Sequence, residues 1–300
     1  MKNLLSLESL QAEEITALVD LGAELKARRG EVGDRPFAGQ CWALIFNKSS
    51  TRTRVSFEVG VRELGGYVMF LSGGDLQLGR GEPIRDTARV LGRMVHGAII
   101  RTYAQEDVED FASFSGIPTI NALTDEEHPC QILADLLTMR EKIGGWEGRK
   151  VVFLGDGDCN VSKSWIWASE RLGFELVIAA PEAFQPSAGY LAKLEGGTVR
   201  CEADAISAVQ GADVLYTDVW VSMGKEDEVA QRMNVLAPYQ INATLLGEAG
   251  EGTLVMHCLP AYREKEITEE ILEAHADTIF QQAENRLHAQ KAVLSMLNTP

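Results

Sequence analysis

The chain has 300 residues, of which 45% are hydrophobic, and its formal net charge at pH 7 is −16. This length and composition allow a substantial core in a globular protein of one large domain or two. The acidic balance argues against a general nucleic-acid binder and against a membrane-surface protein, because both favour a basic face. We therefore expect any anionic ligand to be held by a local basic cluster.

The five cysteines are odd in number and widely spaced, and no two of them form a CxxC pair. This pattern predicts neither a disulfide framework nor a thiolate zinc site. No apolar run approaches the length of a membrane span, and the first residues lack the apolar stretch of a signal peptide. We expect a cytoplasmic protein with no membrane or nucleic-acid partner.

The first half of the chain reads as an α/β domain. After an amphipathic helix over Ser9 to Arg29, strand-like and helix-like segments alternate. This alternation predicts a parallel sheet with helices on both faces. The glycines at 144, 145 and 148 then interrupt the pattern, so we place a domain boundary there. The expected strands are 41–46, 66–71, 97–101 and 117–121, and the helices after them are 51–64, 83–94, 106–114 and 129–142.

The second half begins a new α/β series, which predicts a second doubly wound domain with a mainly parallel sheet. A long polar insert follows the fourth strand position of this series at 213–217. The last segment, Gln281 to Leu297, is expected to be helical and to return to the first domain. The domains are then 1–143 with 284–300, and 144–283. The expected strands are 150–154, 175–179, 197–201, 213–217 and 253–257, with helices 161–172, 204–210 and 268–275.

The segment Ser50-Thr51-Arg52-Thr53-Arg54 lies where the first strand gives way to a helix. A helix N-terminus offers unpaired N–H groups and positive dipole potential, and hydroxyls and guanidiniums add donors that match phosphate oxygens. The segment therefore predicts a site for a phosphorylated ligand. The plain alternative is a Ser/Thr helix cap followed by two solvated arginines.

Other polar residues follow the remaining strands of this half, and ligands of open α/β sheets bind beyond the carboxyl ends of strands. Gln77 lies after the second strand, Arg101 ends the third, and His128 and Gln131 follow the fourth. Pro129 suits a first helical turn, which places His128 at a helix N-terminus. That position favours the neutral imidazole as a donor to an oxygen. The alternatives are a capping or packing histidine and a surface arginine.

The second half offers candidates for an amino-acid ligand. The turn containing Gly155 and Gly157 lacks the third glycine of a dinucleotide fingerprint, so these glycines are read as turn residues, and Asn160 is a donor for a carboxylate. Asp218 and Ser222 could bind an ammonium group, or could belong to a solvated acidic loop. Cys258 could be a nucleophile, a ligand-orienting thiol or a buried residue, and the sequence shows no base beside it.

Four motifs together resemble those of ornithine carbamoyltransferases over essentially the whole chain. They are Ser-Thr-Arg-Thr-Arg at 50–54, His-Pro-Cys-Gln at 128–131, Asp-Val-Trp-Val-Ser-Met-Gly at 218–224 and His-Cys-Leu-Pro at 257–260. The resemblance implies a carbamoyl-phosphate domain, an ornithine domain and a homotrimer with shared active sites. It also implies a reaction that needs no metal and no cofactor.

The resemblance also implies roles for individual residues. The expected phosphate cradle is Ser50, Thr51, Arg52 and Thr53, and Gln77 is the residue lent by an adjacent subunit. The expected carbamoyl-group binders are Arg101, His128 and Gln131, and the reaction centre is completed by Cys258, Leu259 and Arg286. The expected ornithine set is Asn160, Asp218, Ser222 and Met223. The Asp158-Cys159 link before Asn160 is longer than the family usually has.

Two other classes of protein were weighed against this resemblance. A nicotinamide-dependent dehydrogenase is disfavoured by the missing third glycine. A two-domain binding protein without catalysis predicts that Arg101→Ala alters affinity alone. Within the family, aspartate, putrescine and acetylated ornithine are alternative acceptors.

Overall fold

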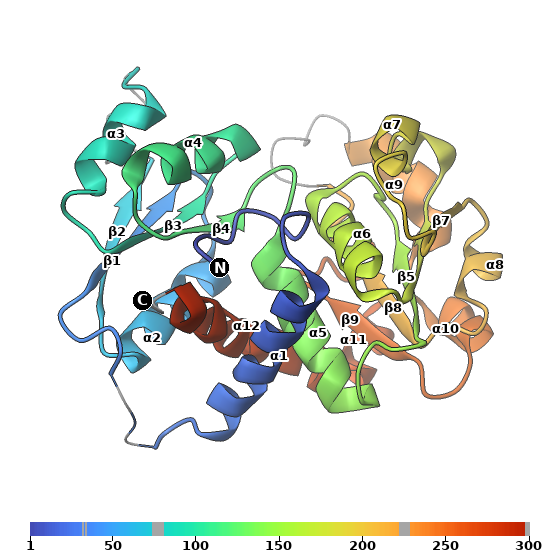
Figure 1. The fold of residues 1–300 in the computed structure, drawn as a ribbon. Coiled ribbons are helices and arrows are strands. Elements are labelled where there is room, and N and C mark those ends of the chain that lie inside the picture. The colour runs from blue at the N-terminus through green and yellow to red at the C-terminus, as the bar shows by residue number, and fades with distance from the viewer. Residues whose placement is uncertain (32, 34, 74–80, 222–228, 298–300) are drawn as a thin grey trace. The chain divides into compact units, whose positions relative to one another are not determined.

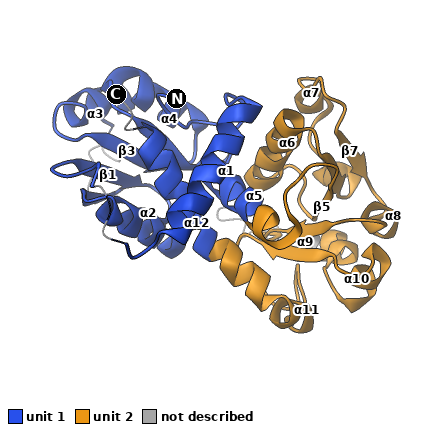
Figure 2. Cartoon of the chain, turned by 60° about the horizontal axis from the view of Figure 1, so that its bottom comes forward, with its two compact units in different colours: residues 1–137, 284–300 blue, residues 138–283 orange. Residues whose placement is uncertain are grey.

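The computed structural model describes residues 1–31, 33, 35–73, 81–221 and 229–297, and it divides into two compact units. The first unit holds residues 1–137 and 284–300, and the second holds residues 138–283 (Figure 2). Each unit has a parallel sheet with helices around it (Figure 1). Helices α5 (Pro129–Ile143) and α12 (Ala276–Leu297) contribute residues to both units.

The sheet of the first unit has the strand order β2-β1-β3-β4, and all neighbouring strands are parallel. Its central strand β1 has the sequence CWALIF and is almost completely buried, as expected for a strand covered on both faces. The chain passes from β1 to β2 on one side and later adds β3 on the other. The strand order therefore reverses between β1 and β3, and ligands of such sheets bind at this reversal. The strands are β1 (Cys41–Phe46), β2 (Tyr67–Ser72), β3 (Gly97–Arg101) and β4 (Thr119–Leu123).

Helices cover both faces of this sheet. One core cluster joins Ile45 and Ile100 of the sheet to Ala88 of α3 and Phe111 of α4. Helix α12 packs closely on α2 at Gly60, where a Cβ atom would lie 3.3 Å from the side chain of Lys291. The helices of this unit, besides those it shares, are α1 (Ala12–Ala27), α2 (Thr51–Glu63), α3 (Ile84–Leu91) and α4 (Gln105–Ser115).

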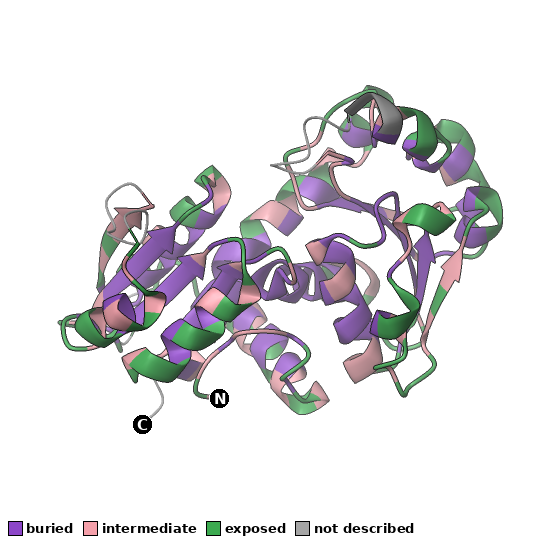
Figure 3. Ribbon diagram, turned by 90° about the horizontal axis from the view of Figure 1, so that it is seen from above, coloured by how far each residue is buried: buried purple, intermediate pink, exposed green. Residues whose placement is uncertain are grey.

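The sheet of the second unit has the order β7-β6-β5-β8-β9, again with parallel neighbours. The strand order reverses between β5 and β8. Strands β5, β6, β8 and β9 are mostly buried, whereas the edge strand β7 is not, and the helices around the sheet expose one side (Figure 3). The elements in chain order are β5 (Lys150–Leu154), α6 (Asn160–Leu172), β6 (Glu175–Ala179), α7 (Ala188–Leu191), β7 (Val199–Glu202), α8 (Ala205–Val209), β8 (Val214–Thr217), α9 (Val229–Leu236), α10 (Ala243–Ala249), β9 (Leu254–His257) and α11 (Glu269–Ala274).

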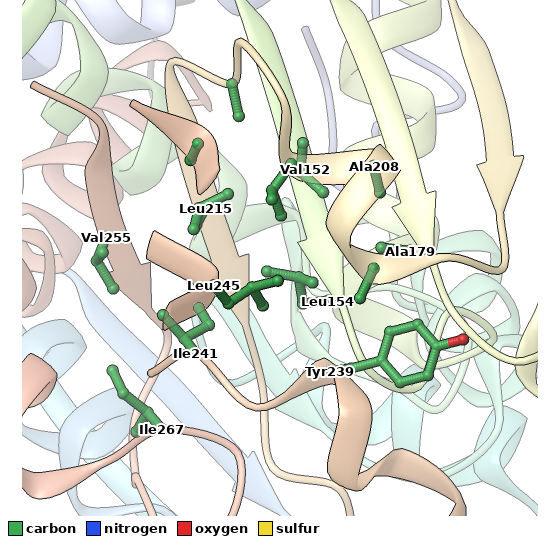
Figure 4. Close-up of a cluster of buried hydrophobic side chains, with 14 of the residues drawn as sticks. Val152, Leu154, Ala179, Ala208, Leu215, Tyr239, Ile241, Leu245, Val255 and Ile267 are labelled. Atoms are coloured by element: carbon green, nitrogen blue, oxygen red, sulfur yellow. The ribbon is translucent and has the colours of Figure 1, made fainter. Parts of the chain in front are cut away.

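The polar insert of the second half contains structure that the sequence analysis did not predict, namely helices α9 and α10. Leu236, Ile241, Leu245 and Ala249 of this region are buried in the same cluster as Val152 and Leu215 of the sheet (Figure 4). These short helices are stabilised by tertiary packing rather than by an amphipathic pattern of their own. The last helix also begins earlier than expected, at Ala276.

The N-terminal segment adds one further contact that the sequence does not predict. The Leu4 amide donates to the Thr119 carbonyl at 3.0 Å, and the Asn121 amide donates to the Leu4 carbonyl at 2.7 Å. This single parallel bridge places residue 4 beside β4. The segment just before α5 is thereby packed against the start of the chain.

Candidate active-site residues

The helix α2 begins as the sequence predicts, with Ser50 as its N-cap. The Ser50 hydroxyl accepts a hydrogen bond from the Thr53 amide at 3.3 Å and donates to the Thr53 hydroxyl at 3.0 Å. Thr53 is buried, whereas Thr51 is exposed and Arg52 is half-buried. The other main-chain N–H groups of the first turn of α2 therefore lie beside the hydrogen-bonded hydroxyls of Ser50 and Thr53. This arrangement of donors suits an anion.

Arg54, the second arginine of this segment, is bound by two groups that lie away from the helix N-terminus. The Arg54 guanidinium lies 3.8 Å from the centre of the Phe70 ring and forms an ion pair with Glu58 at 3.5 Å. Arg54 is not one of the residues expected to form the phosphate cradle. Its ring partner belongs to β2, and its carboxylate partner lies on the next turn of α2.

A second group of polar residues gathers at the carboxyl ends of β3 and β4. Arg101 is the last residue of β3 and pairs with Phe46, the last residue of β1, so both strands end at one level. His128 is buried directly before Pro129, the first residue of α5. Burial lowers the pKa of His128 well below its usual value, and the positive charges of Arg286 and Arg101 act in the same direction. The imidazole is therefore neutral, as the sequence analysis expects.

Arg286 connects this group to the N-terminus of α2. Its Nη1 atom donates to Oε1 of Gln131 at 2.7 Å, and its Nη2 atom donates to the Thr53 hydroxyl at 3.3 Å. Gln131 in turn donates to Oδ1 of the buried Asp135 at 2.8 Å. Five of the residues predicted for the carbamoyl-phosphate side, Thr53, Arg101, His128, Gln131 and Arg286, thus lie close together in the first unit. Asp135 is an addition that the sequence analysis missed.

In the second unit, the register of β8 and β9 brings Asp218 and Cys258 together. Thr217 pairs with His257, so the next residue on each strand lies at the same edge. The Cys258 thiol donates to Oδ1 of Asp218 at 2.8 Å. Burial raises the pKa of Asp218, while the hydrogen bond from the Cys258 thiol acts against that rise. This geometry fits the orienting role proposed for Cys258 better than a nucleophile or a buried spectator.

His257 supports the loop that carries Cys258, a role that the sequence analysis did not assign. Its Nδ1 atom accepts the Leu259 amide at 2.9 Å, so the proton lies on Nε2, which is 3.2 Å from the buried Glu266 carboxylate. Leu259 has a left-handed φ of 57°. The hydrogen bond from the Leu259 amide to the imidazole stabilises this otherwise disfavoured backbone conformation, so Leu259 is held beside Cys258.

Asn160 is the first residue of α6, and Cys159 is the N-cap whose Sγ atom accepts the Ser162 amide. The longer Asp158-Cys159 link therefore ends in a normal helix start. Gly155 has a φ of 120°, and a Cβ atom on Gly157 would lie 2.4 Å from Ile178. Both glycines are required by the turn, as expected, and need no dinucleotide.

Three predicted site residues, Gln77, Ser222 and Met223, lie outside the residues that the structure describes. Among those it does describe, no group of three His, Cys, Asp or Glu side chains is arranged to hold a metal ion. The same part of the chain contains no helix long and apolar enough to cross a membrane.

Comparison with protein families decides the class of the chain. A family model described as "Aspartate/ornithine carbamoyltransferase, carbamoyl-P binding domain" matches residues 2–141, and one described as "Aspartate/ornithine carbamoyltransferase, Asp/Orn binding domain" matches residues 147–297. The chain belongs to the aspartate/ornithine carbamoyltransferase family. The sequence-based prediction of this family and of a carbamoyl-transferring enzyme is confirmed, and the dehydrogenase interpretation is wrong.

Individual relatives agree over the full length. The chain is 60% identical to the ornithine carbamoyltransferase of Akkermansia muciniphila, a match that covers 99% of this chain and 98% of the relative. It is 47% identical to that of Methanocorpusculum labreanum, with 99% and 98% covered. The solved structure of the ornithine carbamoyltransferase from Pyrococcus furiosus has a TM-score of 0.93 at 43% identity, covering 99% of this chain and 96% of that one. The predicted fold class, two parallel-sheet domains flanked by helices, is confirmed.

Proposed function

We propose that the chain is an ornithine carbamoyltransferase, which transfers the carbamoyl group of carbamoyl phosphate to the δ-amine of L-ornithine and forms L-citrulline and phosphate. The observation that carries the choice of acceptor is the bond between the Cys258 thiol and the Asp218 carboxylate. A half-buried carboxylate with an oriented thiol is a fitting partner for an amine. The full-length similarity to proteins named ornithine carbamoyltransferase supports the same choice.

The phosphate of the donor binds at the N-terminus of α2. Ser50 and Thr53 shape the first turn by their mutual hydrogen bonds, and Thr51, Arg52 and the open main-chain amides supply donors to the phosphate oxygens. Arg52 is the charged member of this set. It stabilises the phosphate both while it is bound and while it departs.

The carbamoyl oxygen binds Arg101 and His128, and Gln131 holds the carbamoyl amide. Charge builds on this oxygen when the carbonyl carbon is attacked, and fixed donors stabilise that charge because they need no reorganisation. The lowered pKa of His128 keeps the imidazole neutral, so it donates a hydrogen bond without adding a third positive charge beside two guanidiniums. Arg286 holds Gln131 and completes the electrostatic environment.

The reaction is a direct attack. The lone pair of the neutral δ-amine forms the new C–N bond, and the C–O bond to phosphate then breaks with its electron pair leaving on phosphate. The amine loses one proton, and the departing phosphate accepts it. Asp218 and Cys258 orient the amine. Because the leaving phosphate accepts the proton, no dedicated base is needed.

The two halves of the chain have separate tasks in this proposal. Residues 1–143 with 284–300 bind carbamoyl phosphate, and residues 144–283 bind ornithine. Asn160 and Asp218 contact the α-carboxylate and amino groups together with Ser222 and Met223. Leu259 borders the reacting carbon beside Cys258, and Gln77 is contributed by a neighbouring subunit.

The assembly that we propose is a homotrimer with shared sites. The edge strand β2 exposes Tyr67 and Met69 on one face, with 68% and 46% of their surfaces accessible, and Val55 of α2 is 54% accessible. Large apolar side chains on an edge strand favour contact with another chain. Light scattering on Met69→Glu should show smaller particles than the wild type. A trimer that is unchanged by Met69→Glu and Tyr67→Glu together would exclude this face.

We also propose a cytoplasmic enzyme of arginine biosynthesis. All five cysteines are free thiols, which suits a reducing compartment. The product citrulline carries the ureido group from which a guanidino group can be built. Complementation of an arginine-requiring strain that lacks this activity tests the pathway, and growth that still requires arginine would contradict it.

An acceptor panel tests the activity. Phosphate release from carbamoyl phosphate is measured with ornithine, putrescine, aspartate and acetylornithine at equal concentration, and ornithine should be fastest. Asp218→Asn should lose most of the ornithine rate. A higher rate with any other acceptor would show that the acceptor is assigned wrongly.

A further inference from the structure

Arg232 of α9 bridges two loops at the point where the strand order of the second sheet reverses. Its Nε atom donates to the Trp220 carbonyl at 2.6 Å, and its Nη2 atom donates to the Asp156 carboxylate. Asp156 follows β5 and Trp220 follows β8, and these strands are neighbours. One guanidinium therefore ties together the carboxyl ends of the two strands where an α/β sheet binds its ligand.

The bridge is buried. Arg232 is 4% accessible and Asp156 is 6% accessible, and the Phe184 ring centre lies 4.8 Å from the guanidinium carbon. Removing one partner of such a pair leaves the other charge buried and unsatisfied, which is costly. Because a planar guanidinium bonds a carboxylate and a carbonyl at fixed angles, it also sets the distance between the two loops.

Both bridged loops carry residues proposed to bind the acceptor. Trp220 lies two positions after Asp218, and Asp156 lies in the turn that leads to Asn160. Burial raises the pKa of the Cys159 thiol, and the charges of Asp218 and Asp156 raise it further, so both carboxylates lie near this helix cap. A shift of either loop would change the separation of Asp218 and Asn160.

We propose that Arg232 is a positioning residue for the amino-acid acceptor, which fixes Asp218 relative to Asn160 by holding the Trp220 carbonyl and the Asp156 carboxylate. This inference rests on the proposed function for the identity of the acceptor. It assigns Arg232 no contact with either substrate. Replacing Arg232 should weaken the binding of the amino-acid acceptor and leave the binding of carbamoyl phosphate unchanged.

The chain offers a matched control at the opposite ends of the same two strands. Arg149 precedes β5 and forms an ion pair with Asp213, which precedes β8, at 2.7 Å. It also donates to the Ile143 carbonyl at 2.8 Å. Arg149 thus binds one carboxylate and one carbonyl, as Arg232 does, but away from the proposed acceptor site. The Arg149 pair is more exposed than the Arg232 bridge, so a purely structural role of Arg232 predicts a larger loss of stability with both KM values unchanged.

The experiment compares wild type, Arg232→Gln, Arg232→Lys and Arg149→Gln in steady-state kinetics, with ornithine and carbamoyl phosphate each varied separately. Arg232→Gln should raise KM for ornithine about 10- to 100-fold, as expected for loss of a buried charged hydrogen bond. Its KM for carbamoyl phosphate should stay near the wild-type value. The KM of Arg232→Lys for ornithine should lie between those of the wild type and Arg232→Gln. An ammonium group can keep the charge pair with Asp156 but lacks the fixed geometry of the guanidinium. Arg149→Gln should change neither KM.

Thermal unfolding accompanies the kinetics. If Arg232→Gln does not fold, the Arg232→Lys variant decides, and its ornithine KM must exceed that of Arg149→Gln. Equal changes in both KM values, or a melting-temperature loss with unchanged ornithine KM, would overturn the inference. Wild-type enzyme that prefers another acceptor would instead refute the proposed function, and the comparison would then be made with that acceptor.

Discussion

Arg286 and Gln131 are joined by a hydrogen bond of 2.7 Å between Nη1 of the guanidinium and Oε1 of the amide. The amide nitrogen of Gln131 is at the same time bound to Asp135, so the orientation of the amide is fixed. The guanidinium also reaches the Thr53 hydroxyl. A short chain of polar contacts therefore links α5, α12 and the N-terminus of α2, and it holds the proposed donor site in shape before the substrate arrives.

Replacing Arg286 tests this link. Arg286→Gln should lower kcat/KM for carbamoyl phosphate about 100-fold or more, because it removes a preorganised charge near the reacting group. Lys291→Gln is the control, since Lys291 lies on the same helix and pairs with Glu63 at 2.7 Å away from the site. Steady-state kinetics of the two variants should differ sharply. Equal effects would indicate that Arg286 merely supports the helix.

The Arg101→Ala variant distinguishes a catalyst from a binding protein. We expect turnover to fall by about a hundredfold or more, because one donor to the developing negative charge is lost. Single-turnover kinetics at saturating carbamoyl phosphate measures this step apart from binding. A variant with weaker binding but normal turnover would indicate that Arg101 contributes to binding affinity alone.

The protonation state of His128 predicts a pH effect. The pKa of His128 in the folded protein lies well below the usual 6.5. At a pH between these two values, the unfolded chain binds a proton at this residue and the folded protein does not. Its contribution to folding stability is complete above that usual pKa and is lost as pH falls below it. Imidazole nitrogen shifts in NMR should show a ring that is still neutral at a pH where an ordinary histidine is half protonated. A ring that titrates near 6.5 would contradict the role of neutral donor.

Glu127 predicts a second pH effect of opposite direction. Burial raises the pKa of this carboxyl from 4.5 to about 8, and the Leu7 amide donates to it at 2.8 Å. The folded state then holds a proton that the unfolded chain has lost, so stability falls as pH rises from about 4.5 to about 8. Glu127→Gln should flatten this fall in chemical denaturation. An unchanged pH slope would place the ionisation elsewhere.

The hydrogen bond between Cys258 and Asp218 predicts that two substitutions of Cys258 lower the activity to different extents. Cys258→Ser keeps a donor to the Asp218 carboxylate, whereas Cys258→Ala removes it and leaves a half-buried carboxylate short of one hydrogen bond. We expect the serine variant to retain more activity with ornithine than the alanine variant. Rates at varied ornithine concentration measure the difference. The reverse order would contradict the orienting role of the hydrogen bond between Cys258 and Asp218.

The strands of the two sheets could be predicted because the sequence patterns that indicate them are local. Strands such as 41–46 and 150–154 are runs of apolar residues next to glycines and polar turns, and they occur at the expected residues. The proposed site followed from one rule, that ligands bind at the carboxyl ends of strands. Ser50 as a helix cap and His128 before Pro129 are likewise short-range patterns.

What the sequence did not predict depends on contacts between distant residues. Arg232 and Asp156 are separated by 76 positions, and nothing near either residue indicates its partner. At shorter range, Asp135 lies four positions from Gln131 and Glu266 lies nine positions from His257, but no motif in the sequence marks these buried carboxylates as partners. The contact between Arg54 of α2 and the Phe70 ring of β2 likewise depends on the fold.

The central claim is the transfer of a carbamoyl group to the δ-nitrogen of ornithine. The most direct test incubates the protein with carbonyl-labelled ¹³C carbamoyl phosphate and L-ornithine and follows the labelled carbon by NMR together with phosphate release. The account predicts a ureido carbon bonded to the δ-nitrogen, formed in step with phosphate and lost in Arg101→Ala. Phosphate release without labelled citrulline, or label on a different amine, would contradict it.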